Sequence, residues 1–206
     1  MTFDPSIHGR RSIRLRGYDY SLPGAYFVTL CVSGRLCLFG DVFDDEVRLT
    51  TAGEIARIRW SELPGRFGHI ALSDFIVMPN HIHGILINEL DTYDRAPDSS
   101  TVRTVVGARF IAPNSEAIAA NSPSTAHSAR APTLGNIVRA FKATTAREIR
   151  EHVDPAFAWQ RNYYERVIRD DDEMKRIRKY IIENPIRWNI DRDNPDATTD
   201  GDEPML

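Results

Sequence analysis

The segment that most constrains the fold lies between residues 70 and 88, where two apolar runs stand on either side of Pro79-Asn80. Residues 70–78 and 81–88 have the apolar, partly β-branched composition of strands. Pro-Asn between them predicts a turn or a bulge. A tight connection of this kind joins antiparallel neighbours, so the sequence predicts a pair of antiparallel strands in the middle of the chain.

The remaining elements follow from apolar periodicity and from turn and capping signals. Helical spacing predicts three helices, the first capped by Thr50 or Thr51, the second by Thr133 and the third by Asp170 or Asp171. These helices are expected at about 51–63, 133–151 and 171–184, and further extended segments at 26–32, at 36–39 and 46–49 (a hairpin around 40–45) and at 159–169.

The main elements are ordered strand, helix, strand, strand, helix, strand, helix. This order is the split β-α-β pattern. The predicted class is therefore α+β, a ferredoxin-like antiparallel sheet with helices on one face and a long insertion. Many unrelated proteins share this pattern, so the fold alone does not indicate a function.

One domain is expected over residues 1–188, with a flexible insertion at 89–132 and an acidic, disordered tail at 189–206. No apolar run approaches the roughly 18 residues of a membrane span. The N-terminus lacks the apolar segment of a signal peptide, so we expect a cytoplasmic protein without a membrane partner. Cys31 and Cys37 are the only cysteines, which excludes a disulfide framework.

The charge of the chain is unevenly distributed. The net charge is −3, but residues 191–206 contain six acidic residues and one basic residue, a charge of −5 that leaves the rest of the chain at +2. Basic residues gather near the N-terminus and between residues 161 and 179. Such clusters are most often solvated surface, so they do not by themselves indicate a nucleic-acid partner.

Two histidines flank one aliphatic residue at the start of the 81–88 strand. His81 and His83 therefore share one face of that strand, where two imidazoles can hold a single metal ion. Tyr180 and Asn184 lie four residues apart, one turn along one face of the last predicted helix. An amide oxygen suits Mg²⁺ or Mn²⁺, and imidazole suits Mn²⁺. These residues are candidates for a divalent metal site with a tyrosine beside it. The local pattern alone favours a structural interpretation, with ordinary hydrogen-bonding histidines, Tyr180 as an aromatic residue at the edge of the core and Asn184 as the C-terminal residue of a helix.

A tyrosine can act as a nucleophile only with help, because its hydroxyl has an ordinary pKa of about 10. A divalent metal bound to a phosphate would polarise the phosphorus–oxygen bonds and offset the developing charge. A phosphotyrosine link would preserve the bond energy of a broken DNA strand, so rejoining would need no ATP. The absence of a phosphate-binding G-x-x-x-x-G-K-[ST] loop is consistent with such chemistry.

Four blocks of this chain resemble those of the single-tyrosine, His-hydrophobe-His DNA transposases, in particular the REP-associated tyrosine transposases. The resemblance covers about residues 10–88 and 133–188, and four blocks in the same order are more specific than any one of them. The blocks are Arg-Gly-Tyr-Asp-Tyr-Ser at 16–21 followed by Gly-Ala-Tyr-Phe-Val-Thr at 24–29, Pro-Asn-His-Ile-His-Gly at 79–84, the segment 159–169 that begins Trp-Gln-Arg-Asn-Tyr-Tyr, and Tyr-Ile-Ile-Glu-Asn-Pro at 180–185.

The resemblance implies metal-dependent cleavage and transfer of single-stranded DNA, often at a hairpin. Tyr180 would form a 5′-phosphotyrosine and free a 3′-hydroxyl, while His81, His83 and Asn184 would hold Mg²⁺ or Mn²⁺. It also implies a homodimer, whose active sites lie within one chain or are shared between two. The basic residues then expected to contact DNA are Arg10, Arg11, Arg14, Arg16, Arg161, Arg166, Arg169, Arg176 and Lys179.

Alternatives remain open at this point. Tyr163 and Tyr164 compete with Tyr180 as nucleophiles, but they belong to the Trp-Gln block and are interpreted as structural. A tyrosine nickase of the replication-initiator or relaxase type would share the same residues. A non-catalytic DNA-binding domain kept by the host is a third hypothesis, which the joint presence of His81, His83 and Tyr180 disfavours.

Overall fold

The computed structural model describes residues 18–89, 132–191 and 193–197. The basic residues predicted at the N-terminus, nearly all of the insertion predicted at 89–132 and the end of the acidic tail lie outside the described residues. None of the helices in the described part of the chain is long and apolar enough to cross a membrane.

The centre of the fold is a four-stranded sheet in which every neighbouring pair of strands is antiparallel. The strand order is β4-β5-β1-β6. This arrangement confirms the predicted α+β class and the ferredoxin-like antiparallel sheet. The strands are β1 (Gly24–Cys31), β4 (Ile70–Val77), β5 (His81–Asn88) and β6 (Tyr164–Ile168).

β5 lies in the interior of the sheet between β4 and β1. All of its residues except Ile87 are buried, because both faces of the sheet are covered. The register places His81 opposite Cys31 and His83 opposite Thr29 on β1. Since side chains alternate along a strand, both histidines point to the same face.

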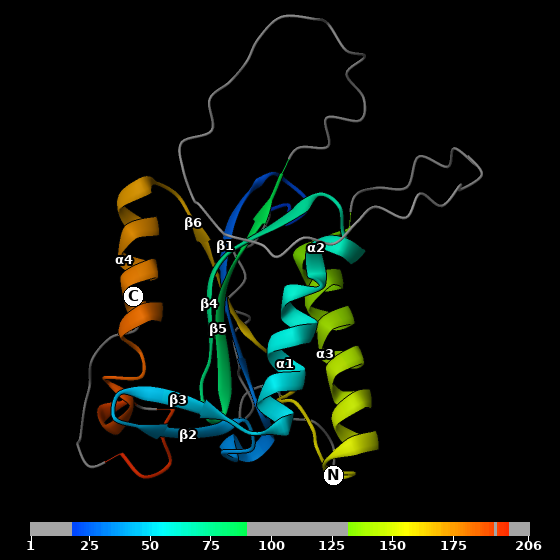
Figure 1. Cartoon of the computed structure of the whole chain (residues 1–206). Coiled ribbons are helices and arrows are strands. Elements are labelled where there is room, and N and C mark those ends of the chain that lie inside the picture. The colour runs from blue at the N-terminus through cyan, green and yellow to red at the C-terminus, as the bar shows by residue number, and fades with distance from the viewer. Residues whose placement is uncertain (1–17, 90–131, 192, 198–206) are drawn as a thin grey trace, which may run out of the picture. The chain divides into compact units, whose positions relative to one another are not determined.

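Helices cover both faces of the sheet (Figure 1), whereas the sequence predicted them on one face. Val28 and Ile82 pack under the first two long helices, while Phe27 and Ile85 pack under the last one. Strands that are apolar on both faces must be covered on both, which is the reason for the difference. The helices are α1 (Thr51–Ser61), the short α2 (Leu63–Arg66), α3 (Leu134–His152) and, on the second face, α4 (Asp171–Glu183).

Two of the predicted helix caps make the expected hydrogen bond. The Thr50 hydroxyl accepts from the amide of Gly53 at the start of α1. The Asp170 carboxylate accepts from the amide of Glu173 at the start of α4, at 2.7 Å. Such caps satisfy amide groups that a helix leaves unpaired in its first turn.

A separate hairpin follows β1, formed by β2 (Gly40–Phe43) and β3 (Glu46–Leu49). Its turn is Asp44-Asp45, with φ of 50° and 63°, so the prediction of residues 36–39 as the first arm was wrong. Two successive left-handed residues make the tight two-residue turn typical of hairpins, and aspartate tolerates that conformation. The loop is therefore shorter than its polar composition indicated.

Glycine is required at position 84 because β5 passes against the indole of the fully buried Trp60. A Cβ added to Gly84 would lie 2.4 Å from Trp60 Cζ2.

We expect Gly84→Ala to lower the free energy of unfolding by about 1–3 kcal/mol through overpacking. Urea denaturation would measure the change. Gly65→Ala is the matched control, since its added Cβ meets nothing within 4 Å, and an equal loss in both variants would contradict the steric explanation.

Candidate active site

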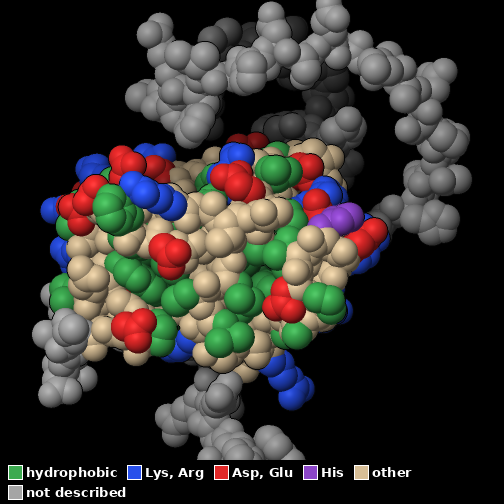
Figure 2. All heavy atoms as spheres, turned by 60° about the horizontal axis from the view of Figure 1, so that its bottom comes forward, with side chains coloured by type: hydrophobic (Ala, Val, Ile, Leu, Met, Phe, Trp, Pro, Cys, Tyr) green, Lys and Arg blue, Asp and Glu red, His purple; other side chains and the backbone are tan. Residues whose placement is uncertain are grey.

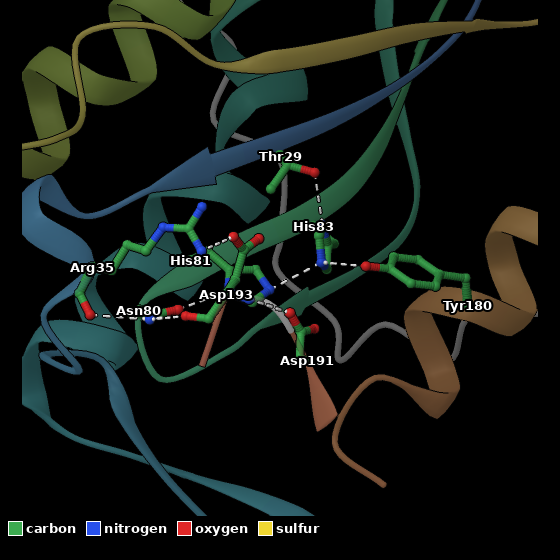
Figure 3. Close-up of polar contacts among 8 residues, drawn as sticks. All are labelled: Thr29, Arg35, Asn80, His81, His83, Tyr180, Asp191 and Asp193. Carbon is green, nitrogen blue, oxygen red and sulfur yellow. Dashed lines mark hydrogen bonds and ion pairs between the residues drawn. The ribbon is translucent and has the colours of Figure 1, made fainter. Parts of the chain in front are cut away.

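Two buried histidines form the centre of the site. His81 and His83 are 0% exposed, and their Nε2 atoms lie 2.9 Å apart on the α4 face of the sheet (Figure 3). The His83 ring stacks on Phe27 with 5.5 Å between centroids. The strand alternation thus brings two imidazoles to one point in the interior.

Asn80 determines which nitrogen of His81 carries the proton. The Asn80 amide nitrogen donates to the backbone carbonyls of Asp193, at 2.6 Å, and Arg35, at 3.1 Å. Its oxygen therefore faces His81 Nδ1, 2.8 Å away, and must accept a hydrogen bond from it. Nε2 of His81 consequently presents its lone pair toward His83.

Thr29 holds the second histidine from the neighbouring strand. Its hydroxyl lies 2.8 Å from His83 Nδ1, as the β1–β5 register requires. Each histidine thus has its outer nitrogen in contact with a side-chain oxygen and its Nε2 at the centre (Figure 3). Metal-binding histidines are typically oriented in this way.

The two histidines and Asp191 form a group that can bind one metal ion. One ligand atom from each of the three residues lies within 4.8 Å of the others. Two nitrogen ligands at right angles on one ion, each about 2.1 Å from it, would be about 3 Å apart. The observed separation of 2.9 Å between the two Nε2 atoms fits that geometry.

Burial lowers the pKa of His81, and the Arg35 guanidinium acts in the same direction. The carboxylates of Asp193 and Asp191 and the amide of Asn184 oppose this shift. Burial is the largest effect, so the neutral imidazole is favoured. Neutral imidazole is the form that binds a metal ion.

Asn184, the predicted third ligand, lies at the C-terminal end of α4 and is 1% exposed. Its side chain is close enough to His81 to raise the pKa of that residue, yet neither of its amide atoms has hydrogen-bonding geometry with a partner. A buried polar group without a partner costs about 1–3 kcal/mol. The Asn184 oxygen is therefore a second oxygen donor, beside Asp191, that a metal ion or a substrate would satisfy.

Tyr180 reaches the histidines from α4. Its hydroxyl oxygen lies 3.3 Å from His83 Nε2, and its ring packs edge-on against Phe27. Ile177 and Ile181 anchor this helix in the small apolar cluster on that face of the sheet. Because Tyr180 lies beside this apolar stripe, its polar end meets the polar centre of the site.

The competing tyrosines lie elsewhere. Tyr164 packs on the Phe27 ring with 6.2 Å between centroids. Tyr163 lines a groove beside α3, on the other side of the molecule from α4. Their structural interpretation remains a prediction, which the arrangement favours.

The C-terminal segment covers the histidines. Trp188 packs against the His81 ring, and Asp193 is buried in an ion pair with Arg35. Residues 189–206 were predicted as a disordered tail, but 189–191 and 193–197 are described and contribute to this cover. Figure 2 shows this end of the molecule, where hydrophobic side chains gather in the middle of the face. His81 and His83 have no exposed surface beneath this cover.

The basic residues predicted to contact DNA differ in their surroundings. Arg166 pairs with Glu173 at 2.6 Å, and Lys179 lies 3.7 Å from Glu183. Arg161 lines the groove beside α3. Of the others, Arg169 and Arg176 are exposed, while Arg10, Arg11, Arg14 and Arg16 lie outside the described residues.

Sequence reasoning missed four residues that surround the histidines: Thr29, Asn80, Asp191 and Asp193. Thr29 could have been found only from the β1–β5 register. Asn80 directly precedes His81 and was interpreted as part of a turn. The two aspartates appear in the sequence as members of an acidic tail, with no local signal for a ligand.

The fold and the site define an α+β protein with a ferredoxin-like sheet, in which a buried histidine pair faces a tyrosine on the last long helix. No protein-family model matches the chain. It is 33% identical over 190 residues to an uncharacterized protein of Haemophilus influenzae, covering 92% of this chain and 96% of that protein. The chain belongs to the same family as the Haemophilus influenzae protein.

Two solved structures are similar to this chain. One is a REP-associated tyrosine transposase bound to a REP hairpin, with 15% sequence identity, a TM-score of 0.49 and coverage of 85% of this chain and 74% of that one. The other is a putative transposase from Deinococcus radiodurans, with 16% identity, a TM-score of 0.38 and coverage of 84% and 98%.

If Thr29 orients His83 for metal binding, removing its hydroxyl should weaken that binding. We expect Thr29→Val, which preserves the side-chain volume, to reduce Mn²⁺ affinity about tenfold or more, whereas Thr29→Ser should keep it. Isothermal titration calorimetry would measure both. Equal affinities in the valine and serine variants would exclude an orienting role for the hydroxyl.

Proposed function

We propose that this protein cleaves single-stranded DNA at hairpin-containing sites and transfers the strand through a 5′-phosphotyrosine intermediate, as a metal-dependent tyrosine transposase. The observation that carries the proposal is the position of the Tyr180 hydroxyl, 3.3 Å from His83 Nε2, where the nitrogens of His81 and His83 converge. The four sequence blocks that resemble REP-associated tyrosine transposases support the same chemistry.

In the proposed reaction the Tyr180 hydroxyl oxygen attacks the scissile phosphorus. An oxygen–phosphorus bond forms, the bond from phosphorus to the 3′ oxygen breaks, the phenol loses its proton and the departing 3′ oxygen gains one. The products are a 5′-phosphotyrosine and a free 3′-hydroxyl. Attack by another 3′-hydroxyl on the phosphotyrosine joins a new strand and restores Tyr180 without ATP.

His81 and His83, with an oxygen from Asp191 or Asn184, would hold the Mg²⁺ or Mn²⁺ ion. When bound, this ion would polarise the phosphate and offset the negative charge of the transition state. Asn80 and Thr29 would keep the two imidazoles oriented. The unpaired amide of Asn184 supports the presence of a further ligand at this point.

Access to the site requires a rearrangement. The histidines have no exposed surface, and Trp188, Asp191 and Asp193 lie around them. A DNA phosphate can therefore reach Tyr180 and the histidines together only after the C-terminal segment moves aside. The contact between Tyr180 and His83 within one chain supports an active site that does not depend on a second copy, while a homodimer and a cytoplasmic location remain predictions.

The central test is a covalent adduct between the protein and a labelled single-stranded hairpin in the presence of Mn²⁺ or Mg²⁺. We expect the adduct on a denaturing gel to disappear with Tyr180→Phe and with EDTA, because the first removes the nucleophile and the second the metal. Adding an acceptor strand with a 3′-hydroxyl should give a joined product with a transposase and none with a nickase.

Tyr163→Phe and Tyr164→Phe are the matched controls for this assay. Both should form the adduct as the unmodified protein does, since neither side chain supplies the attacking oxygen. An adduct that persists in Tyr180→Phe and is lost in either control would contradict the assignment of Tyr180 as the nucleophile.

Loss of the histidine pair should separate chemistry from binding. We expect His81→Ala with His83→Ala to abolish metal-dependent cleavage and to change hairpin affinity by less than about threefold, because phosphate contacts supply most of the affinity. A mobility-shift assay measures the binding. His81→Gln with His83→Gln retains more side-chain volume and controls for collapse of the buried site. If this variant lost hairpin binding as strongly as cleavage, the histidines would not have a role in cleavage that is separate from binding.

A further inference from the structure

A groove of about 670 Å³ lies between α3 and residues 158–163. Its lining includes four cations, Arg139, Lys142, Arg150 and Arg161, and no acidic residue of the described chain. α3 covers the sheet face opposite to the one that carries the histidines (Figure 1). The groove is therefore separate from the candidate active site.

The cations of the groove are not neutralised by the described part of the chain. Arg150 donates to the carbonyl of Phe157 and Lys142 to two carbonyls, but none of the four forms an ion pair with a described carboxylate. By contrast, Arg166 on β6 and Arg178 on α4 are each paired with an acidic residue. Four such charges around one groove attract a polyanion.

Lys142 is the most enclosed of these cations. Its Nζ donates to the carbonyl oxygens of Gln160, at 2.9 Å, and Asn162, at 3.0 Å. Burial lowers the pKa of Lys142 to about 8. The two carbonyl oxygens carry only partial negative charge. A phosphate in the groove would supply a full negative charge to the Lys142 ammonium.

Two half-buried aromatic rings, Trp159 and Tyr163, also line the groove. The ammonium of Lys142 lies 6.0 Å from the Trp159 ring centroid and 5.7 Å from that of Tyr163. Cations combined with aromatic faces are the features that bind single-stranded nucleic acid, because phosphates pair with the cations and unpaired bases stack on the rings. A duplex hides its base faces, and an acidic peptide would leave the rings without a partner.

We propose that this groove is a second DNA site, which holds unpaired nucleotides of the strand whose scissile phosphate lies at the histidine pair. The choice of DNA rests on the function proposed above. Because the two sites lie on opposite faces of the sheet, a strand bound at both must pass around an edge of it. The groove would thus position the substrate without taking part in the chemistry.

Fluorescence anisotropy with a labelled single-stranded oligodeoxythymidine tests this proposal, using the full chain with Tyr180→Phe so that no cleavage occurs. Arg139→Ala with Arg161→Ala should weaken binding about tenfold and lower the slope of log affinity against log salt by about 1.4, since each phosphate contact with a single strand contributes about 0.7. Tyr163→Leu, which retains apolar packing, should weaken binding about tenfold through lost stacking.

Arg147→Ala is the matched control. Arg147 is an exposed arginine on the same helix. Because it does not line the groove, its replacement should leave the salt slope nearly unchanged. Equal effects of Arg147→Ala and the double variant would overturn the proposal, as would tighter binding of a duplex or of an oligouridine RNA.

Photocrosslinking separates the failure of this proposal from that of the proposed function. An oligonucleotide containing 5-iododeoxyuridine should crosslink to residues 158–163, as identified by mass spectrometry. Crosslinks only at other segments would refute the groove site even if the Tyr180-dependent adduct forms. Crosslinks at 158–163 without any Tyr180-dependent adduct would support the groove and refute the proposed chemistry.

Discussion

The close approach of two imidazoles inside the protein is the interaction on which the rest of the site depends. The Nε2 atoms of His81 and His83 lie 2.9 Å apart without exposure to water. Two lone pairs repel at that distance, so a proton or a cation must lie between them. Asn80 and Thr29 hold the outer nitrogens, which leaves only the centre open to a ligand.

The two faces of the sheet differ in how firmly they are covered. α1 and α3 cover one face over a large apolar cluster, whereas α4 packs on the other over a cluster of five buried residues that includes Phe27 and Ile85. Two partly exposed ion pairs, through Arg166 and Arg178, add to the hold on α4. Such pairs contribute about 0–1 kcal/mol each. The helix that carries Tyr180 thus packs on a smaller apolar cluster than α1 and α3 do.

Part of the site was predictable because its signals are local. The spacing of His81 and His83 on one strand, and the place of Tyr180 beside the apolar stripe of one helix, both follow from the periodicity of these elements. Asp191 and Asp193 were not predictable, because nothing in an acidic stretch distinguishes the carboxylates that fold back toward the histidines. The groove beside α3 was missed as well, since Arg139 and Arg161 are far apart in the sequence and line one groove only in the folded chain.

The sequence by itself determined the order and type of the elements, the antiparallel pairing of β4 with β5 and the common face of the two histidines. These depend on hydrophobic periods of two and 3.6 residues and on turn residues that act over a few positions. Only the tertiary structure decided that α4 covers the second face of the sheet and that the C-terminal segment closes over His81. Those outcomes depend on which apolar surfaces remain to be buried once the sheet has formed, and no single stretch of sequence contains that information.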